Sequence, residues 1–555
     1  MLFLFDSAKL FFKSKILFIM LCVTSVYVIA STAIWYGKPQ SATEPLANAM
    51  TFTVYMYILM MLVSYEFFRK YNDFGIAEAI NVSPEGRKGK HSKGAFLFLS
   101  LYSFLFSIIV CVIVIIEFLF FKIKDPNHEY IYHIIKAVVL NYFLVMELGI
   151  IVGDALSNLK YKAFSYVVMT FFSIMVSAFP QQIAYMILTS QGENAGAIAY
   201  EITSFFNVIP KLDLYYLTLA EFGENILPYR FFLIGFWGLL FGIVITIKKK
   251  YYRKFICPVS ILCVVCLAGY LYPSSRVDLG LNPNSCLSNI SYYYYYNYDN
   301  VTKDEKADYE ISKYDMELSI KLNLSAKVNM EVSKSLDEYK MTLFHDYKIS
   351  YASNQDGDKL DFTQDGDYVR IINSENKKIT NIILEYKGSS ATYYANSQGC
   401  FLPGYFAYYP RAGYLPLYNQ DKFDLESEFV DEDTYFEVKI DYGKKIISNL
   451  DEENGVYKGK SDGFTMVSGF YKMKDLGNGN TLVYPYMDNN ILHDGIKIED
   501  ELWKKEFEIS ENTLKETGRK NTMIFTMPKM NFYIDAHSGK KQVFSRESFF
   551  YAEEN

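Results

Sequence analysis

Long apolar runs separated by positively charged blocks constrain this chain more than any other feature. Runs such as Ala49–Tyr65 and Gly94–Phe121 are long enough to cross a hydrocarbon core of roughly 30 Å at about 1.5 Å per residue. Further runs share this character, and the sequence predicts seven membrane spans. The expected spans are Ile16–Tyr36, Ala49–Tyr65, Gly94–Phe121, Ile134–Gly153, a run that starts at Ala163 and is interrupted by Pro180, Phe231–Ile247 and Phe255–Pro273.

The charged blocks set the orientation of these spans, because Lys and Arg are enriched in cytoplasmic loops. The segment 66–93 and the tract Lys248–Lys254 are rich in both residue types. Both are therefore expected in the cytoplasm. This places the N-terminus on the cytoplasmic side of the cell membrane and the second half of the chain outside the cell. Residues 1–15 mix apolar residues with lysines and predict a helix that lies along the inner leaflet.

The connection between the fifth and sixth spans, residues 181–229, is unusually long. It contains two semi-apolar segments, Gln181–Thr189 and Ile198–Val208, that are too short to cross a membrane. Backbone at membrane depth must be helical or buried against protein. We expect two outer half-helices that enter the edge of the bilayer.

The second half of the chain has a different composition. Residues 1–276 hold 23 Lys and Arg against 16 Asp and Glu, whereas residues 277–555 hold 32 against 46. An acidic, soluble half argues against nucleic acid as a partner. The expected division is a six-span domain over 1–254, a seventh span over 255–276, an extracellular domain over 277–500 and an α/β extension over 501–555.

Alternation of apolar and polar residues marks strands in this second half. It continues through Tyr314–Val332, which is too long for one strand and predicts two strands with a bend between them. Turn signals such as Asp365-Gly366 separate later strands. The predicted fold class is therefore α+β, a polytopic helical membrane domain followed by a mainly antiparallel β-sandwich. The further expected strands are Met341–Tyr347, Tyr368–Ile372, Ile379–Tyr386, Tyr435–Ile440, Phe464–Tyr471 and Thr481–Tyr486.

Six spans, a charged first cytoplasmic loop and outer half-helices after the fifth span resemble the membrane subunits of type-2 ABC exporters. In that family the loop after the second span carries a Glu and an Arg, then Gly-x-x-Glu and Pro-x-x-Arg. The resemblance covers roughly residues 1–250 and implies that a short amphipathic helix near Asp73–Ile80 docks on a separate ATPase. The alternative is a solvated linker between two spans. The matching docking residues are Glu66, Arg69, Gly75, Glu78, Pro84 and Arg87.

The energy source and the cargo path follow from the same resemblance. The chain lacks the Gly-x-x-x-x-Gly-Lys-[Ser/Thr] loop that cradles a triphosphate. ATP and Mg²⁺ are therefore expected on the partner ATPase, and no cofactor on this chain, while a second permease subunit completes the pathway within the membrane lipid. Glu117 and Glu147 lie inside apolar runs, where carboxylates are costly and often functional. They are candidates for the substrate path, although Glu117 can also reach the membrane surface and Glu147 can also bond between helices.

The soluble half resembles the N-terminal β-domain of aminopeptidase N-type (gluzincin) peptidases. The resemblance rests on the long first strand pair and on Ile383–Gly388, Cys400–Gly413 and Met466–Tyr471, and covers about residues 305–490. The catalytic part is absent, because the six histidines of the chain do not form His-Glu-x-x-His. We therefore expect no enzyme activity from this chain. Arg411, Tyr408 and Tyr409 are candidates for a ligand site in this domain, and a structural salt bridge of Arg411 is the alternative.

Of the seven cysteines, five lie inside apolar runs, where they behave as small apolar residues. Cys286 and Cys400 fall in the soluble half and can form one disulfide. Taken together, the sequence predicts an exporter subunit of a peptide or another amphipathic cargo, with an extracellular binding or sensing domain. The alternatives are a membrane-anchored sensory protein and a non-catalytic scaffold that another peptidase chain completes.

Overall fold

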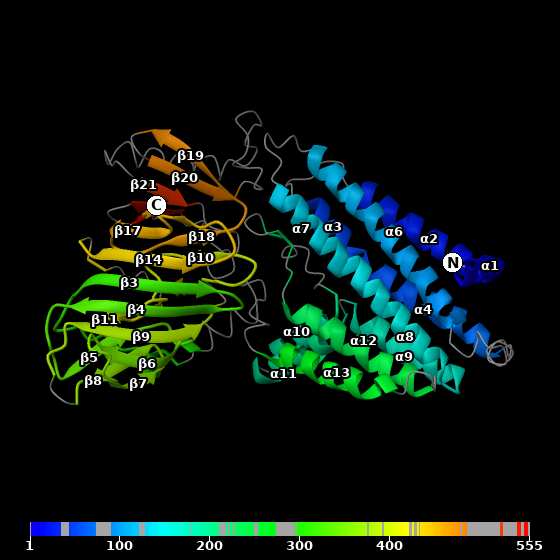
Figure 1. Cartoon of the computed structure of the whole chain (residues 1–555), viewed down its shortest axis with the longest axis horizontal. Coiled ribbons are helices and arrows are strands. Elements are labelled where there is room, and N and C mark those ends of the chain that lie inside the picture. Colours follow the sequence, from blue (N-terminus) through cyan, green and yellow to red (C-terminus); the bar gives the residue numbers. More distant parts are fainter. Residues whose placement is uncertain are drawn as a thin grey trace. The chain divides into compact units, whose positions relative to one another are not determined.

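The chain folds into two compact units, each described by itself below (Figure 1). One unit comprises Met1–Thr218 and Gly223–Arg276, and the other comprises Leu219–Phe222 and Val277–Asn555. The computed structural model describes residues 2–34, 44–73, 90–120, 128–177, 179–191, 193–209, 218–219, 223–224, 226, 228–248, 254–272, 293–294, 297–374, 377–390, 393–420, 424–426, 430–431, 433–477, 480–485, 522–525, 541–545 and 549–552.

The first unit is helical. Five of its described segments are long and apolar enough to cross a membrane: Lys15–Ala33, Pro45–Lys70, Ser92–Leu119, His128–Ser157 and Pro228–Ile247. The unit therefore has the helices of a membrane protein. The helices are α1 (Leu2–Lys13), α2 (Lys15–Ile34), α3 (Glu44–Thr51), α4 (Thr53–Asp73), α6 (Lys90–Phe120), α7 (His128–Val138), the π-helix η2 (Val139–Leu144), α8 (Val145–Ser157), α9 (Lys162–Met175), α10 (Phe179–Gln191), α11 (Glu193–Phe206), α12 (Pro228–Lys248) and α13 (Ile256–Leu271).

Two of the seven predicted spans correspond to shorter helices. α9 has 14 residues and α13 has 16, against the about 20 that a perpendicular span needs. α9 ends where the chain turns at Val176 and Ser177, because Pro180 belongs to the first turn of the next helix, where its missing N–H costs little. The two helices α10 and α11 occupy the connection between the fifth and sixth predicted spans, where two half-helices are predicted.

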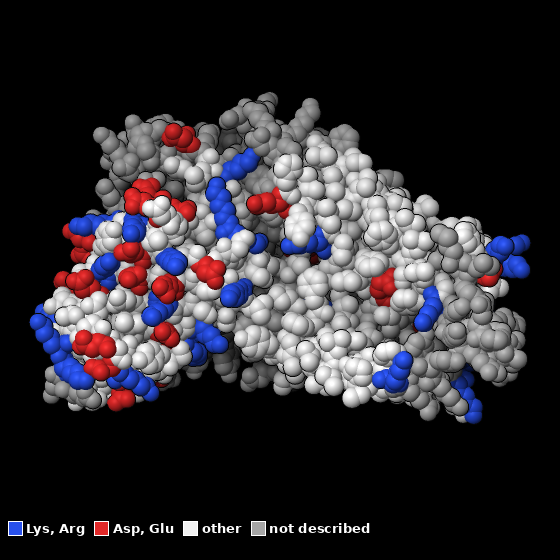
Figure 2. Space-filling view, in the orientation of Figure 1, with Lys and Arg blue, Asp and Glu red and all other residues white. Residues whose placement is uncertain are grey.

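The helical unit exposes many large apolar side chains. Ile16 on α2, Leu105 on α6 and Val167 on α9 are each more than half exposed, at 72%, 52% and 64%. Figure 2 shows few charged residues on the visible face of this unit, whereas both signs of charge are interspersed over the β-rich unit. An apolar outer surface of this extent is what contact with lipid requires.

Helices α4 and α8 pack closely because two glycines face the contact. A Cβ atom on Gly149 would lie 2.8 Å from the Tyr57 carbonyl oxygen, and one on Gly153 would lie 2.8 Å from the Tyr65 backbone nitrogen. Ser64 Oγ donates a hydrogen bond of 2.8 Å to the Ile150 carbonyl across the same contact. Small residues four apart allow such close approach between membrane helices.

The close contact predicts a clear mutational effect. Gly153→Ala places a methyl group against the backbone of α4, and we expect the helical unit to lose about 1–3 kcal/mol of stability from overpacking. Gly242→Ala is the matched control, because nothing lies within 4 Å of its Cβ position in α12. Thermal unfolding in detergent should show a lower Tm for Gly153→Ala alone. Equal Tm values for both variants would contradict this packing.

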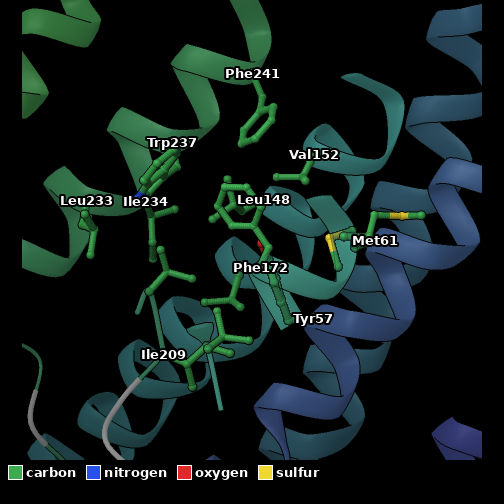
Figure 3. Packing of buried hydrophobic residues seen from close by; sticks show 14 of the residues in the cluster. Tyr57, Met61, Leu148, Val152, Phe172, Ile209, Leu233, Ile234, Trp237 and Phe241 are labelled. Carbon is green, nitrogen blue, oxygen red and sulfur yellow. The ribbon is translucent and has the colours of Figure 1, made fainter. Parts of the chain in front are cut away.

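A cluster of buried apolar side chains, most of them from α4, α8, α9 and α12, lies inside the helical unit (Figure 3). Trp237 on α12 is central: its ring meets Phe172 at 5.3 Å between centroids in an edge-to-face arrangement. Trp237 Nε1 also donates a hydrogen bond of 2.9 Å to the Phe205 carbonyl at the end of α11. The hydrogen bond of Trp237 therefore joins α12 to α11.

The second unit is rich in β-sheet. Its largest sheet has seven strands in the order β16-β17-β14-β3-β4-β9-β6. The predicted alternating segment forms β3 and β4, which pair antiparallel and bury every second residue. The strands of this sheet are β3 (Ile311–Ile320), β4 (Leu324–Val332), β6 (Lys348–Asn354), β9 (Asn381–Gly388), β14 (Tyr435–Asp441), β16 (Asp451–Glu453) and β17 (Val456–Lys460).

Smaller sheets complete the second unit, and most pairs are antiparallel as predicted. The exceptions are β14 with β3 and β20 with β21, which run parallel. The described residues beyond 500 form three strands. The remaining strands of this unit are β5 (Glu338–Thr342), β7 (Asp361–Asp365), β8 (Tyr368–Ile372), β10 (Cys400–Leu402), β11 (Arg411–Ala412), β12 (Tyr418–Asn419), β13 (Asp424–Leu425), β15 (Ile447–Ser448), β18 (Met466–Ser468), β19 (Tyr471–Gly477), β20 (Asn480–Pro485), β21 (Thr522–Phe525), β22 (Lys541–Ser545) and β23 (Phe549–Ala552).

Candidate functional site

The candidate site lies at the C-terminal end of α4, where a long apolar helix becomes charged. The last two turns of α4 carry Glu66, Arg69 and Lys70, and the chain then continues into the segment 74–89. Each of these three side chains contacts a different part of the helical unit. We call this group, with its partners, the α4 junction.

Arg69 binds the end of α8. Its Nη1 donates hydrogen bonds to the carbonyl of Ser157, at 3.2 Å, and to that of Leu159, and Nη2 donates to the Lys160 carbonyl at 3.4 Å. The last carbonyls of a helix have no partner within the helix and carry partial negative charge. A guanidinium group with several donors is suited to bind them.

Glu66 and Lys70 connect α4 to two further elements. The Tyr166 hydroxyl on α9 donates a hydrogen bond to Glu66 Oε1. Lys70 Nζ donates at 2.6 Å to Oγ of Ser14, the residue between α1 and α2. Since Glu66 and Lys70 are one helical turn apart, a single turn of α4 is attached to α9, to the end of α8 and to the α1–α2 break.

The structure describes two of the six predicted docking residues. Glu66 and Arg69 lie three positions apart on α4, both within the α4 junction. Gly75, Glu78, Pro84 and Arg87 lie outside the described residues, as does most of the predicted amphipathic helix.

The two membrane carboxylates occupy separate positions. Glu147 on α8 accepts a hydrogen bond of 2.8 Å from Ser100 Oγ on α6. Glu117 lies on α6 and is 17 residues beyond Ser100, which corresponds to about 25 Å along the helix. Its Oε2 is buried without a hydrogen-bond partner among the described residues. The sequence allowed two roles for Glu147, the substrate path and a bond between helices. The contact with Ser100 is a bond between helices.

The predicted ligand residues of the soluble half lie in its core. Arg411 is 1% exposed, and its guanidinium carbon lies 3.8 Å from the centre of the Tyr409 ring. Arg411 Nη2 donates to the carbonyls of Gly404 and Phe406, and Tyr408 OH donates to that of Phe464. Within the described part of the chain these contacts go to backbone and ring, with no carboxylate in salt-bridge distance of Arg411.

The Cys286–Cys400 disulfide stays a prediction, because only Cys400 of the pair lies among the described residues. Cys400 on β10 has a free thiol, which is buried and lies 3.8 Å from the Met466 carbonyl. Burial raises the pKa of this thiol. Cys286 lies outside the described residues.

A buried polar cluster that involves Glu224, Arg230 and Asn141 was not predicted from the sequence. Arg230 Nη2 donates a hydrogen bond to Asn141 Oδ1, which belongs to the π-helix η2. Such π-helical segments are frequent at functional sites. The signal in the sequence was an arginine at the start of an otherwise apolar run.

No protein-family model matches the chain, and no curated protein does. Among solved structures, part of the chain is similar to an M1 zinc metallopeptidase from Deinococcus radiodurans, at 12% identity and a TM-score of 0.24 over 35% of this chain and 52% of that one. It is also similar to native leukotriene A4 hydrolase from Saccharomyces cerevisiae, at 11% identity and a TM-score of 0.24 over 35% and 36%. The chain thus spans about a third to a half of the proteins that it matches.

Proposed function

We propose that this chain is the membrane subunit of an ABC-type exporter that works with a separate ATPase. The α4 junction carries the proposal, because the helix that leads directly into the segment 74–89 is attached to three other elements. A displacement of that segment is transmitted through Glu66, Arg69 and Lys70 to the helices around α4. These attachments favour a docking segment over the alternative of a solvated linker between two spans.

The proposed cycle begins at the partner. ATP and Mg²⁺ bind to ATPase chains, whose closure pushes on the segment 74–89 through Gly75, Glu78, Pro84 and Arg87. Because α4 and α8 are in close contact at Gly149 and Gly153, the two helices move together. A second permease subunit completes the pathway, and Glu147 and Glu117 contribute polar groups to it. The cargo is a peptide or another amphipathic molecule.

The β-rich unit is assigned to the outer side of the membrane, as a domain that captures or senses cargo without cutting it. Its histidines do not form the His-Glu-x-x-His arrangement that holds a catalytic zinc ion. The strongly cationic tract before α13 keeps that end of α12 in the cytoplasm, so the chain after α13 is expected outside.

Affinity purification from membranes in detergent, followed by mass spectrometry, tests the assignment. We expect an ATPase with a phosphate-binding loop to copurify with the full chain, and Glu78→Lys to lower its recovery. Recovery of a peptidase subunit, or recovery of the ATPase that Glu78→Lys leaves unchanged, would contradict the assignment.

A further inference from the structure

Glu224 is a completely buried carboxylic acid at the outer connection of the helical unit. It belongs to the short strand β2 (Gly223–Glu224), four residues before α12 begins. Its exposed fraction is 0%, as is that of Asn141 on η2, and Arg230 on α12 is 3% exposed. Three polar side chains from three elements therefore share a region from which water is excluded.

The hydrogen bonds in this cluster leave specific atoms unsatisfied. Arg230 Nη2 donates to Asn141 Oδ1 and, at 3.3 Å, to the Val208 carbonyl. Both carboxyl oxygens of Glu224 and the amide nitrogen of Asn141 have no hydrogen-bond partner among the described residues. An ionised carboxylate without donors is very costly to bury, whereas a neutral carboxylic acid is much less so.

The α7 helix closes this region on another side. A Cβ atom on Gly223 would lie 2.6 Å from His133 Nε2 and 3.1 Å from the ring of Tyr130. Gly223 also has a φ of +74°, which favours glycine. The strand therefore lies against two aromatic rings of α7.

Among the described residues, the charged group that acts on Glu224 is Arg230 from α12. His133 and Tyr130 from α7 lie beside the adjacent Gly223, and the neutral Asn141 from η2 accepts a hydrogen bond from Arg230. Burial raises the pKa of Glu224 well above its ordinary value, and the Arg230 charge opposes this shift only in part. The buried position of Glu224 therefore favours its neutral, protonated form.

We propose that Glu224 is a proton-binding site that holds strand β2 between α7 and the start of α12. When the acid is protonated, its neutral side chain fits the buried position. When the proton leaves to solvent, the charged carboxylate requires hydrogen-bond donors or water that the described residues do not supply to it, and β2 loosens. The site is independent of the exporter assignment, because it needs neither the ATPase nor the cargo.

The sign of the pH effect follows from linkage. Because the pKa of Glu224 is higher in the folded than in the unfolded chain, the unfolded chain releases its proton first as pH rises. The folded chain therefore loses stability between the ordinary pKa of a glutamic acid, about 4.3, and the raised pKa of Glu224. Glu224→Gln has a neutral side chain at every pH, so this loss of stability with rising pH should not occur in the variant.

Thermal unfolding of the full chain in detergent, from about pH 5 to about pH 8, tests the proposal. We expect the Tm of Glu224→Gln to differ least from that of the unmodified chain near pH 5 and to exceed it increasingly toward pH 8. Glu201→Gln is the matched control, because Glu201 is an exposed acid on α11 and should leave the pH dependence unchanged. Parallel pH profiles of the unmodified chain and Glu224→Gln would overturn the proposal.

Infrared spectroscopy gives a second readout that does not depend on one variant. At neutral pH we expect a carbonyl stretch from a protonated carboxyl group that Glu224→Gln abolishes. If Glu224→Gln does not fold, Glu224→Asp keeps a carboxyl group and should shift that band. A band that neither substitution changes would show that Glu224 is ionised, and the proposal would fail.

Discussion

Replacement of Arg69 by Gln should reduce transport-coupled ATP hydrolysis about tenfold while the ATPase stays bound. The neutral side chain cannot serve the three carbonyls that Arg69 binds, one in the last residue of α8 and two just after it. Hydrogen bonds to a charged group contribute about 1.5–3 kcal/mol, and about 1.4 kcal/mol corresponds to a factor of ten in rate. The measurement is ATP turnover of the reconstituted complex with and without cargo.

Lys160→Gln provides the matched control for Arg69→Gln. It removes the same charge from the same region, but the Lys160 ammonium lies over the Tyr161 ring at 5.5 Å and its side chain is exposed. Coupled turnover should therefore remain close to that of the unmodified complex. If Arg69→Gln and Lys160→Gln lose turnover equally, charge near the membrane surface, rather than the α4 junction, is responsible.

In the β-rich unit, Asp367→Ala should be strongly destabilising, by about 3 kcal/mol. Asp367 is 1% exposed and accepts hydrogen bonds from the His345 backbone N–H at 2.7 Å, from His345 Nδ1 at 2.9 Å and from the Tyr294 hydroxyl at 2.9 Å. Burial and the nearby carboxylate raise the pKa of Tyr294, which therefore keeps the proton that it donates. Alanine removes the carboxylate that accepts all three of these buried hydrogen bonds.

Hydrogen exchange on peptides that cover 297–301 and strand β8 measures this effect, because the Tyr294 contact attaches the start of the unit to that strand. Asp365→Ala is the control two residues away: its side chain is 86% exposed and pairs with Lys303 at 3.1 Å. Exposed ion pairs contribute about 0–1 kcal/mol. Exchange that is as slow in Asp367→Ala as in Asp365→Ala would contradict the role of the buried carboxylate.

The sequence predicted the kinds of element better than their exact extent. Apolar runs between cationic blocks indicated membrane helices, and five described helices have the necessary length and composition. The fifth and seventh predicted spans are shorter because apolar composition does not reveal where a helix ends. The turn at Val176 and Ser177 depends on how α9 meets α10. The Gly149-x-x-x-Gly153 pattern was present in the sequence and could have predicted the close α4–α8 contact.

The sequence could predict the residues that α4 contributes to the α4 junction, but not their partners. The family resemblance selected Glu66 and Arg69, but their partners Tyr166 and the end of α8 lie roughly 90 to 100 residues further along the chain. No local pattern connects such positions. Glu224 was missed for the same reason, since its burial depends on the packing of α7 and α12 around a two-residue strand.

In the β-rich unit, alternation located the strands but not their partners. The pattern in Tyr314–Val332 predicted β3 and β4 correctly. It could not show that β14, more than a hundred residues later, pairs with β3 in parallel. Alternation specifies which face of a strand is buried, whereas pairing is decided by the whole sheet. Arg411 was likewise predicted from the sequence as a ligand residue, whereas in the folded unit it is a buried core residue.

Site-specific photo-crosslinking in intact membranes tests the central claim most directly. A photoreactive residue at position 78 lies in the segment that we assign to ATPase docking, and one at position 365 lies on the exposed edge of the β-rich unit. The proposal predicts an adduct between position 78 and a nucleotide-binding ATPase, and no such adduct from position 365. Absence of the adduct at position 78 in membranes that contain the copurifying ATPase, or the same adduct from position 365, would contradict it.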